Sequence, residues 1–157
     1  MQGKMTVFLR KILYDGDTFI SFFEYMPYTN FFARLLLAIL FLFSAYGKII
    51  GFEGTVAMAG SVGIPFPEIA IVLAIIFEVV GSLLILIGKK FAGTGAVMLI
   101  VFTILATFFF HNFWAVPPEQ FQMQLIQFLK NVAIIGGLLL VFEQFRYQCP
   151  LYVTLCG

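Results

Sequence analysis

Ionisable side chains occur inside stretches of this sequence that are otherwise apolar enough to cross a membrane. Glu78 lies near the middle of one such stretch, and Lys130 and Asn131 lie within another. A charged side chain at the centre of a bilayer costs at least about 2.5–3.5 kcal/mol on insertion scales. The two ionisable residues, Glu78 and Lys130, therefore each need an ion partner, a water-filled cavity or a function, and Asn131 adds a neutral polar side chain beside Lys130.

Glu78 and Lys130 are expected at similar depths below the outward membrane surface, because each residue of a helix adds about 1.5 Å along its axis. We therefore predict that they form an ion pair. His111 and Lys48 are expected nearer to the same surface. Their expected depths predict a polar pocket that opens outward, with Glu78, His111, Lys130 and Lys48 in its walls.

A purely structural interpretation of the same residues stays open. In it, the pair of Glu78 and Lys130 sets the register of two helices, while Arg34 and Lys48 extend to their nearest interfaces. His111 would then be an interfacial hydrogen-bonding residue, as suits a position close to Trp114.

The elements that position these residues are predicted to be transmembrane helices. Of the 157 residues, 62% are hydrophobic and 11% are charged, whereas soluble domains average about 45–50% and 25%. Only helices or closed barrels satisfy the backbone in lipid, and the sequence lacks the alternation of barrel strands. The predicted fold is an all-α bundle with spans at about 31–50, 69–88, 91–110 and 124–142, each long enough to cross about 30 Å of hydrocarbon.

Loops and terminal segments complete this picture. The glycine- and proline-rich stretch 51–67 and the stretch 111–121 are predicted to be loops, with a tight turn at Lys89 and Lys90 between them. Residues 1–30 mix charges with aromatic side chains, which favours a segment in the membrane interface. The tail 146–157 carries two cysteines, Cys149 and Cys156, whose spacing matches no metal or redox motif.

The distribution of basic residues predicts the orientation. Lysines and arginines outside the spans fall before span one, between spans two and three, and after span four. By the positive-inside tendency that side is cytoplasmic, and so are both termini. Trp114 is then expected to anchor the outer interface. The net charge of +1 gives no reason to expect a nucleic-acid partner.

An ordered set of residues resembles the DoxX family of four-helix membrane proteins, and the resemblance covers about residues 30–145. The predicted domain boundaries of the DoxX-like bundle are 31–145. The set consists of Arg34, Lys48, Gly63-Ile64-Pro65, Glu78, Gly81, His111, Trp114, Lys130-Asn131 and Gly136-Gly137. The resemblance implies a multi-pass protein of a bacterial or archaeal cytoplasmic membrane. It also implies, for some members, quinone-linked oxidation of sulfur compounds, and for others a place in redox or oxidative-stress complexes.

A membrane quinone is the expected cofactor. The chain has one histidine and no cysteine within a span, which argues against bis-histidine haem and against an iron–sulfur cluster in the bundle. No metal or nucleotide site is expected either. A quinone head needs hydrogen-bond donors and a proton route, and its tail needs apolar walls.

The expected roles follow from that cofactor. His111 and Lys130 would donate to the two quinone oxygens, and Glu78 would pass protons with help from Asn131. Lys48 would attract an anionic substrate or partner, and Arg34 and Trp114 complete the candidate binding residues.

Two other functions stay open. The chain could be a non-catalytic anchor or scaffold for a membrane or peripheral oxidoreductase. A small transporter is the third possibility, weakened by the lack of an obvious internal repeat.

Overall fold

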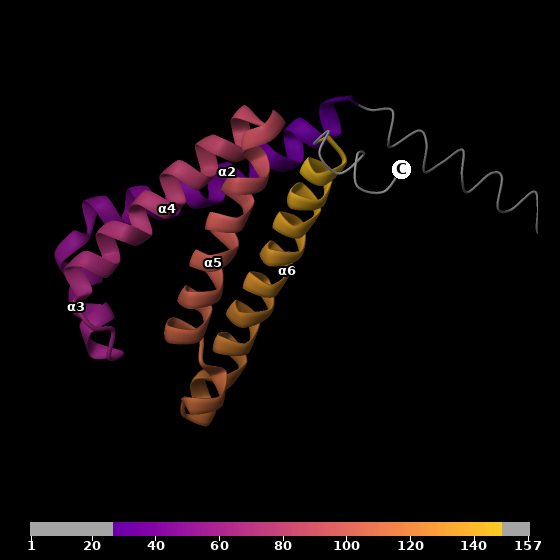
Figure 1. Cartoon of the computed structure of the whole chain (residues 1–157). Helices are drawn as coiled ribbons and strands as arrows, with labels where there is room; N and C mark the ends of the chain where they lie inside the picture. Colours follow the sequence, from indigo (N-terminus) through magenta and orange to yellow (C-terminus); the bar gives the residue numbers. More distant parts are fainter. Residues whose placement is uncertain (1–26, 149–157) are drawn as a thin grey trace, which may run out of the picture. The chain divides into compact units, whose positions relative to one another are not determined.

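The structure, a computed structural model, describes residues 27–148, with only the backbone of Pro27, Lys89 and residues 145–148. The described chain is helical and contains no strand. Its α-helices are α2 (Pro27–Ile50), α3 (Phe52–Ser61), α4 (Pro67–Ile87), α5 (Ala92–Phe110) and α6 (Pro118–Gln148) (Figure 1). The part of the predicted interfacial segment before Pro27, and both cysteines, lie outside the described residues.

The chain consists of two compact units, Met1–Ala33 and Arg34–Gly157. The structure describes residues 27–33 of the first unit, where Phe31 and Phe32 stack edge to face with their ring centroids 5.9 Å apart. The contacts of the hydrophobic core, the ion pair and the pocket all belong to the second unit.

Four of the helices are long and apolar enough to cross a membrane, which confirms the predicted fold class. The candidate spans cover Tyr28–Ile50, Pro67–Ile87, Ala92–Ala115 and Pro118–Gln144. Three helices extend further towards the N-terminus than predicted: α2 includes Pro27, the first described residue, α4 begins at Pro67 and α6 begins at Pro118. A proline fits the first turn of a helix because its missing N–H would have no intrahelical partner there.

A short helix, α3, occupies most of the stretch that was predicted to be the first loop, so that prediction was wrong. The amide of Thr55 donates to the carbonyl of Gly51 at 2.9 Å, which closes the first turn. Ala59 is buried, and α3 packs against α4. The connection itself is shorter and includes Gly63 and Phe66, both with positive φ, just before Pro67 starts α4.

Helices α4 and α5 cross closely near the short turn that joins them. The turn contains the 3₁₀ segment η1 (Lys89–Phe91) and Gly88, whose φ is 70°. A Cβ atom placed on Gly95 would lie 2.6 Å from the carbonyl oxygen of Gly81, so only glycine permits this approach. Away from the turn the two helices diverge, and α6 runs beside α5 (Figure 1).

The hydrophobic core joins all four long helices at the level of this crossing. It contains Phe41 of α2, Ile85 of α4, Leu99 of α5 and Leu138 of α6, together with the small residues Ala38, Ala92 and Ala96. Many large apolar side chains on the same helices are exposed, as expected of surfaces that face lipid rather than water.

Candidate functional site

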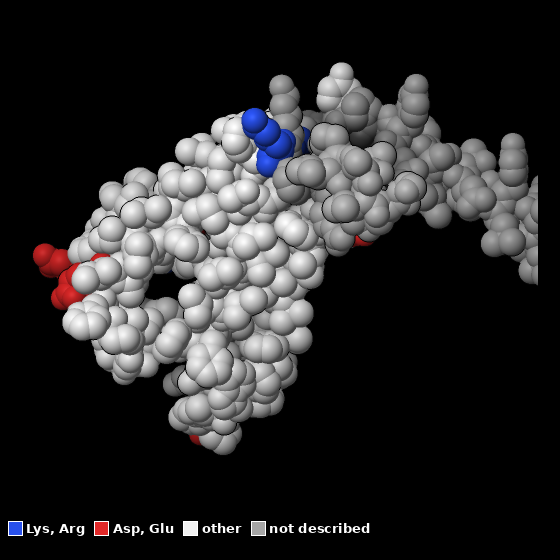
Figure 2. All heavy atoms as spheres, in the orientation of Figure 1, with Lys and Arg blue, Asp and Glu red and all other residues white. Residues whose placement is uncertain are grey.

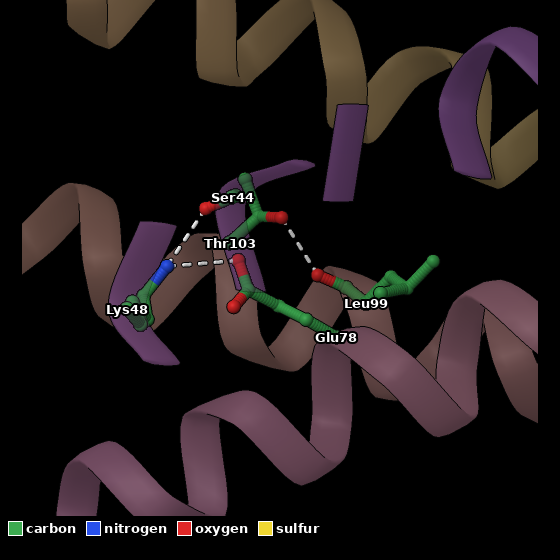
Figure 3. A network of polar contacts seen from close by, with 5 residues as sticks. All are labelled: Ser44, Lys48, Glu78, Leu99 and Thr103. Carbon is green, nitrogen blue, oxygen red and sulfur yellow. Dashed lines mark hydrogen bonds and ion pairs between the residues drawn. The ribbon is translucent and has the colours of Figure 1, made fainter. Parts of the chain in front are cut away.

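An ion pair between α2 and α4 is the central polar feature. The Lys48 ammonium lies 3.0 Å from Oε1 of Glu78 and donates to Oγ of Ser44 at 2.7 Å (Figure 3). Ser44 and Lys48 are four residues apart, so the α-helical repeat places them on one face of α2. Glu78 is 0% exposed and Lys48 is 19% exposed. The pair therefore connects the buried core with the edge of the bundle.

The predicted pair of Glu78 with Lys130 was wrong. Lys130 is exposed on α6, and the ion partner of Glu78 is Lys48. Matching depths placed Glu78 and Lys130 at similar heights in the membrane, but depth says nothing about helix order or about which face of a helix a side chain occupies. Helix packing therefore decided the partner.

A mostly apolar pocket opens where α4 and α5 diverge. Its cavity volume is about 340 Å³, and a hollow between the two helices is visible in the space-filling view (Figure 2). Lys48 is the single charged residue in its wall. The remaining lining residues are apolar: Ile64, Ala70, Ile71, Leu73, Ala74, Phe77, Val101, Phe102, Leu105, Ala106, Phe109 and Phe110.

Aromatic contacts hold the charged end of this pocket. The Lys48 Nζ atom lies 5.2 Å from the ring centroid of Phe102, within range of a cation–π interaction. The Phe102 ring in turn packs edge to face against Phe41 in the core, with centroids 6.2 Å apart. The ammonium thus lies among a carboxylate, a hydroxyl and a ring.

A second set of polar contacts joins α5 to α6. Asn131 donates through Nδ2 to Oγ1 of Thr107 at 2.8 Å. Thr107 and Thr103 each donate to the backbone carbonyl four residues earlier, as threonines commonly do within membrane helices. Nδ1 of His111 lies 3.0 Å from Oε1 of Gln124. None of these residues lines the pocket.

These contacts correct the predicted pocket. The four side chains expected to line it do not come together: Lys48 and Glu78 form one group, His111 lies at the α5–α6 contact, and Lys130 is exposed. The wall of the observed pocket is apolar except at Lys48.

Comparison with known protein families confirms the resemblance to the DoxX family. The DoxX family model matches residues 29–112, which is more than half of the chain. The chain belongs to the DoxX family. It is 33% identical over 109 residues to inner membrane protein YphA of Escherichia coli K12, covering 69% of this chain and 77% of YphA.

A second relative gives a similar result. Inner membrane protein YqjF of the same strain is 36% identical over 109 residues, covering 69% of this chain and 78% of YqjF. No solved structure matches the chain. The ion pair and every residue that lines the pocket lie inside the matched DoxX region, whereas Trp114, Lys130 and Asn131 lie beyond it.

The remaining predicted binding residues of this DoxX protein lie apart from the pocket wall. The Arg34 guanidinium packs so closely over Gly88 that a Cβ atom there would collide with it. Trp114 is 55% exposed and stacks with Phe113, Phe108 and Phe128. Its aromatic neighbours and exposure suit a residue at the membrane interface.

Several residues that shape the site are absent from the sequence-based prediction. Ser44 carries a recognisable signal, since it precedes Lys48 by one helical turn on α2. Phe77 and Phe102 carry none, because in an apolar helix a pocket-lining phenylalanine looks the same as a lipid-facing one. Among the described residues, no group of three histidine, cysteine or acidic side chains could hold a metal ion.

Proposed function

We propose that this DoxX protein binds the head of a membrane quinone in the α4–α5 pocket and serves as a quinone-linked subunit of an oxidoreductase in a bacterial or archaeal cytoplasmic membrane. The observation that carries the proposal is a single ammonium group in an otherwise apolar pocket of about 340 Å³. Small-molecule sites have typical volumes of about 300–1,000 Å³ and combine apolar walls with a few placed polar groups.

The polar end of the pocket favours a neutral ligand with a hydrogen-bond acceptor. A lysine ammonium has three N–H donors, and Ser44 and Glu78 accept two hydrogen bonds from Lys48. The third can point to a carbonyl oxygen. Because Glu78 already balances the charge of Lys48, an anionic head group would leave a net negative charge in a region of low dielectric constant. A quinone carbonyl avoids that cost.

The aromatic walls fit the ring of such a ligand. Phe77, Phe102, Phe109 and Phe110 surround the cavity, and aromatic rings stack favourably in offset or edge-to-face arrangements. When bound, the quinone would supply two-electron redox chemistry, with electrons delivered by a partner oxidoreductase. In this proposal Lys48 orients the head group. Glu78 holds the Lys48 ammonium in place and exchanges protons with Lys48.

Binding of a tritiated short-chain quinone to the full chain in lipid nanodiscs tests the proposal. Ala106→Phe would place a ring in the pocket while leaving Lys48 and Glu78 themselves unchanged, and it is expected to weaken binding at least tenfold. Ala133→Phe, at an exposed position of α6, is the matched control and should leave affinity unchanged. Equal affinity in the two variants, or no saturable binding to the native chain, would overturn the assignment.

Two lysine variants distinguish Lys48, the donor to the quinone in the present proposal, from Lys130, the donor predicted from the sequence. Lys48→Met removes a charged hydrogen-bond donor worth about 1.5–3 kcal/mol, so affinity should fall roughly 10- to 100-fold. Lys130→Met, at a residue outside the pocket wall, should have no effect. Loss of binding in Lys130→Met alone would restore Lys130 as the donor. His111→Ala, also at a residue outside the pocket wall, should likewise have no effect, and loss of binding in it would restore His111 as a donor.

A further inference from the structure

Two polar atoms next to the ion pair are buried and have no hydrogen-bond partner among the described residues. They are Oε2 of Glu78 and Oγ of Ser82. Both residues belong to α4 and both are 0% exposed. They are four residues apart, and side chains with that spacing lie on one face of a helix, with about 5–6 Å between their Cβ atoms.

Such atoms are costly in an apolar interior. Lys48 satisfies Oε1 of Glu78, while Oε2 accepts no hydrogen bond from any described residue. In hydrocarbon-like surroundings an unpaired carboxylate oxygen or hydroxyl loses its hydration without replacement. Two such groups on neighbouring turns are therefore expected to share a small polar ligand.

We propose that Oε2 of Glu78 and Oγ of Ser82 together bind a buried water molecule inside the helix bundle. Hydrogen bonds to water of about 2.8 Å on each side span the distance between neighbouring helical turns. Water can donate to the carboxylate and accept from the hydroxyl, which satisfies both atoms at once. Buried waters in proteins commonly fill this role between otherwise unsatisfied groups.

The charge balance favours water over a cation. Lys48 already neutralises Glu78 at 3.0 Å. A bound metal ion would leave a net positive charge among apolar side chains, and a single carboxylate with one hydroxyl is a poor ligand set for it. A neutral water adds no charge.

The water would extend the polar group of the pocket into the core. The resulting chain of contacts runs from Lys48, at the pocket wall, through Glu78 to the water and then to Ser82 beside Gly81 and the α4–α5 crossing. This site does not depend on quinone binding, so the failure of either proposal leaves the other standing.

Substitution of Ser82 tests the site through the sign of the stability change. If Ser82 holds water, Ser82→Ala and Ser82→Cys should both lower the melting temperature of the full chain in detergent, because the water loses a partner. If the hydroxyl is simply unsatisfied, both changes remove a penalty, and the melting temperature should stay the same or rise. Ser61→Ala, at an exposed position, is the control and should produce little change.

Water-edited solid-state NMR of the full chain in bilayers gives an independent measurement. The Ser82 Cβ signal, assigned by its loss in Ser82→Ala, should receive magnetisation from water. Ile85 is the internal control because it is equally buried, at 0% exposed, three residues further along α4. Transfer to Ser82 without transfer to Ile85 supports the site, and equal absence from both overturns it.

Discussion

Among single residues, the pair of Lys48 and Glu78 combines structural necessity with chemical usefulness. A carboxylate that is 0% exposed would be very costly without its partner. The same ammonium that neutralises it also lines the pocket. One ion pair can therefore set the packing of α2 on α4 and provide a hydrogen-bond donor for a ligand.

Removing the Lys48 ammonium should show how much the stability of the fold depends on its ion pair with Glu78. We expect Lys48→Met to lower the free energy of unfolding by about 3–5 kcal/mol, because it leaves a buried charge unpaired. Adding Glu78→Leu in the same chain should recover most of that loss, since two apolar side chains need no pairing. Reversible unfolding in mixed detergent micelles measures both effects.

Lys90→Met is the matched control for that experiment. Lys90 is exposed and contacts the Phe91 ring, with its Nζ atom 5.3 Å from the ring centroid. Its removal should cost less than about 1 kcal/mol. If Lys48→Met were as mild as this control, the ion pair would not stabilise the fold.

Among the helices, the glycine contact between α4 and α5 determines where the pocket begins. Gly81 and Gly95 let the two backbones approach closely at the turn end, and the helices diverge on the other side of that contact (Figure 1). Small residues at such crossings are the usual means of close helix packing in membranes. The pocket is thus a geometric result of a local crossing.

Gly95→Ala should disturb this crossing. Its new Cβ would lie 2.6 Å from the Gly81 carbonyl oxygen and 3.0 Å from the Ile85 nitrogen, and neither backbone atom can move independently. We expect a loss of about 1–3 kcal/mol in unfolding free energy, as for other overpacked sites. Gly136→Ala is the control, because no atom of a neighbouring helix lies within 4 Å of the place that its methyl group would take. A similar loss in both variants would contradict the role of the crossing.

For the molecule as a whole, the charges near the ends of the helices indicate an orientation. Lys89 and Lys90 lie in the turn between α4 and α5, while Glu53, Glu68 and Glu119 lie near the opposite ends of the helices. Figure 2 shows acidic atoms over α3 and the start of α4. From the positive-inside tendency we propose that the lysine turn faces the cytoplasm.

Cysteine labelling tests that orientation. In a chain with Cys149 and Cys156 replaced by serine, Glu119→Cys should react with a membrane-impermeant maleimide on intact spheroplasts. Lys90→Cys should react only after lysis if its turn faces the cytoplasm as proposed. The reverse pattern would place both termini outside.

Local properties of the sequence were enough to predict the class of fold and to identify the charged residues within the spans that need a partner or a function. Span length and hydropathy are such properties, so four membrane helices followed without any knowledge of their packing. The cost of a charge in lipid is also independent of helix order, and it singled out Glu78 and Lys48. The short helix α3 was missed because scattered glycines indicate a loop, although its buried face on α4 stabilises it.

Which of these residues meet depends on how the helices pack. Two side chains at equal depth can lie on opposite sides of a bundle. Only the packing of α2 against α4 makes Lys48, rather than Lys130, the ion partner of Glu78. The pocket likewise depends on the angle between α4 and α5, which follows from the contact of Gly81 with Gly95. Helix order and rotation depend on contacts between distant parts of the chain, and a one-dimensional pattern of depth and hydropathy does not encode them.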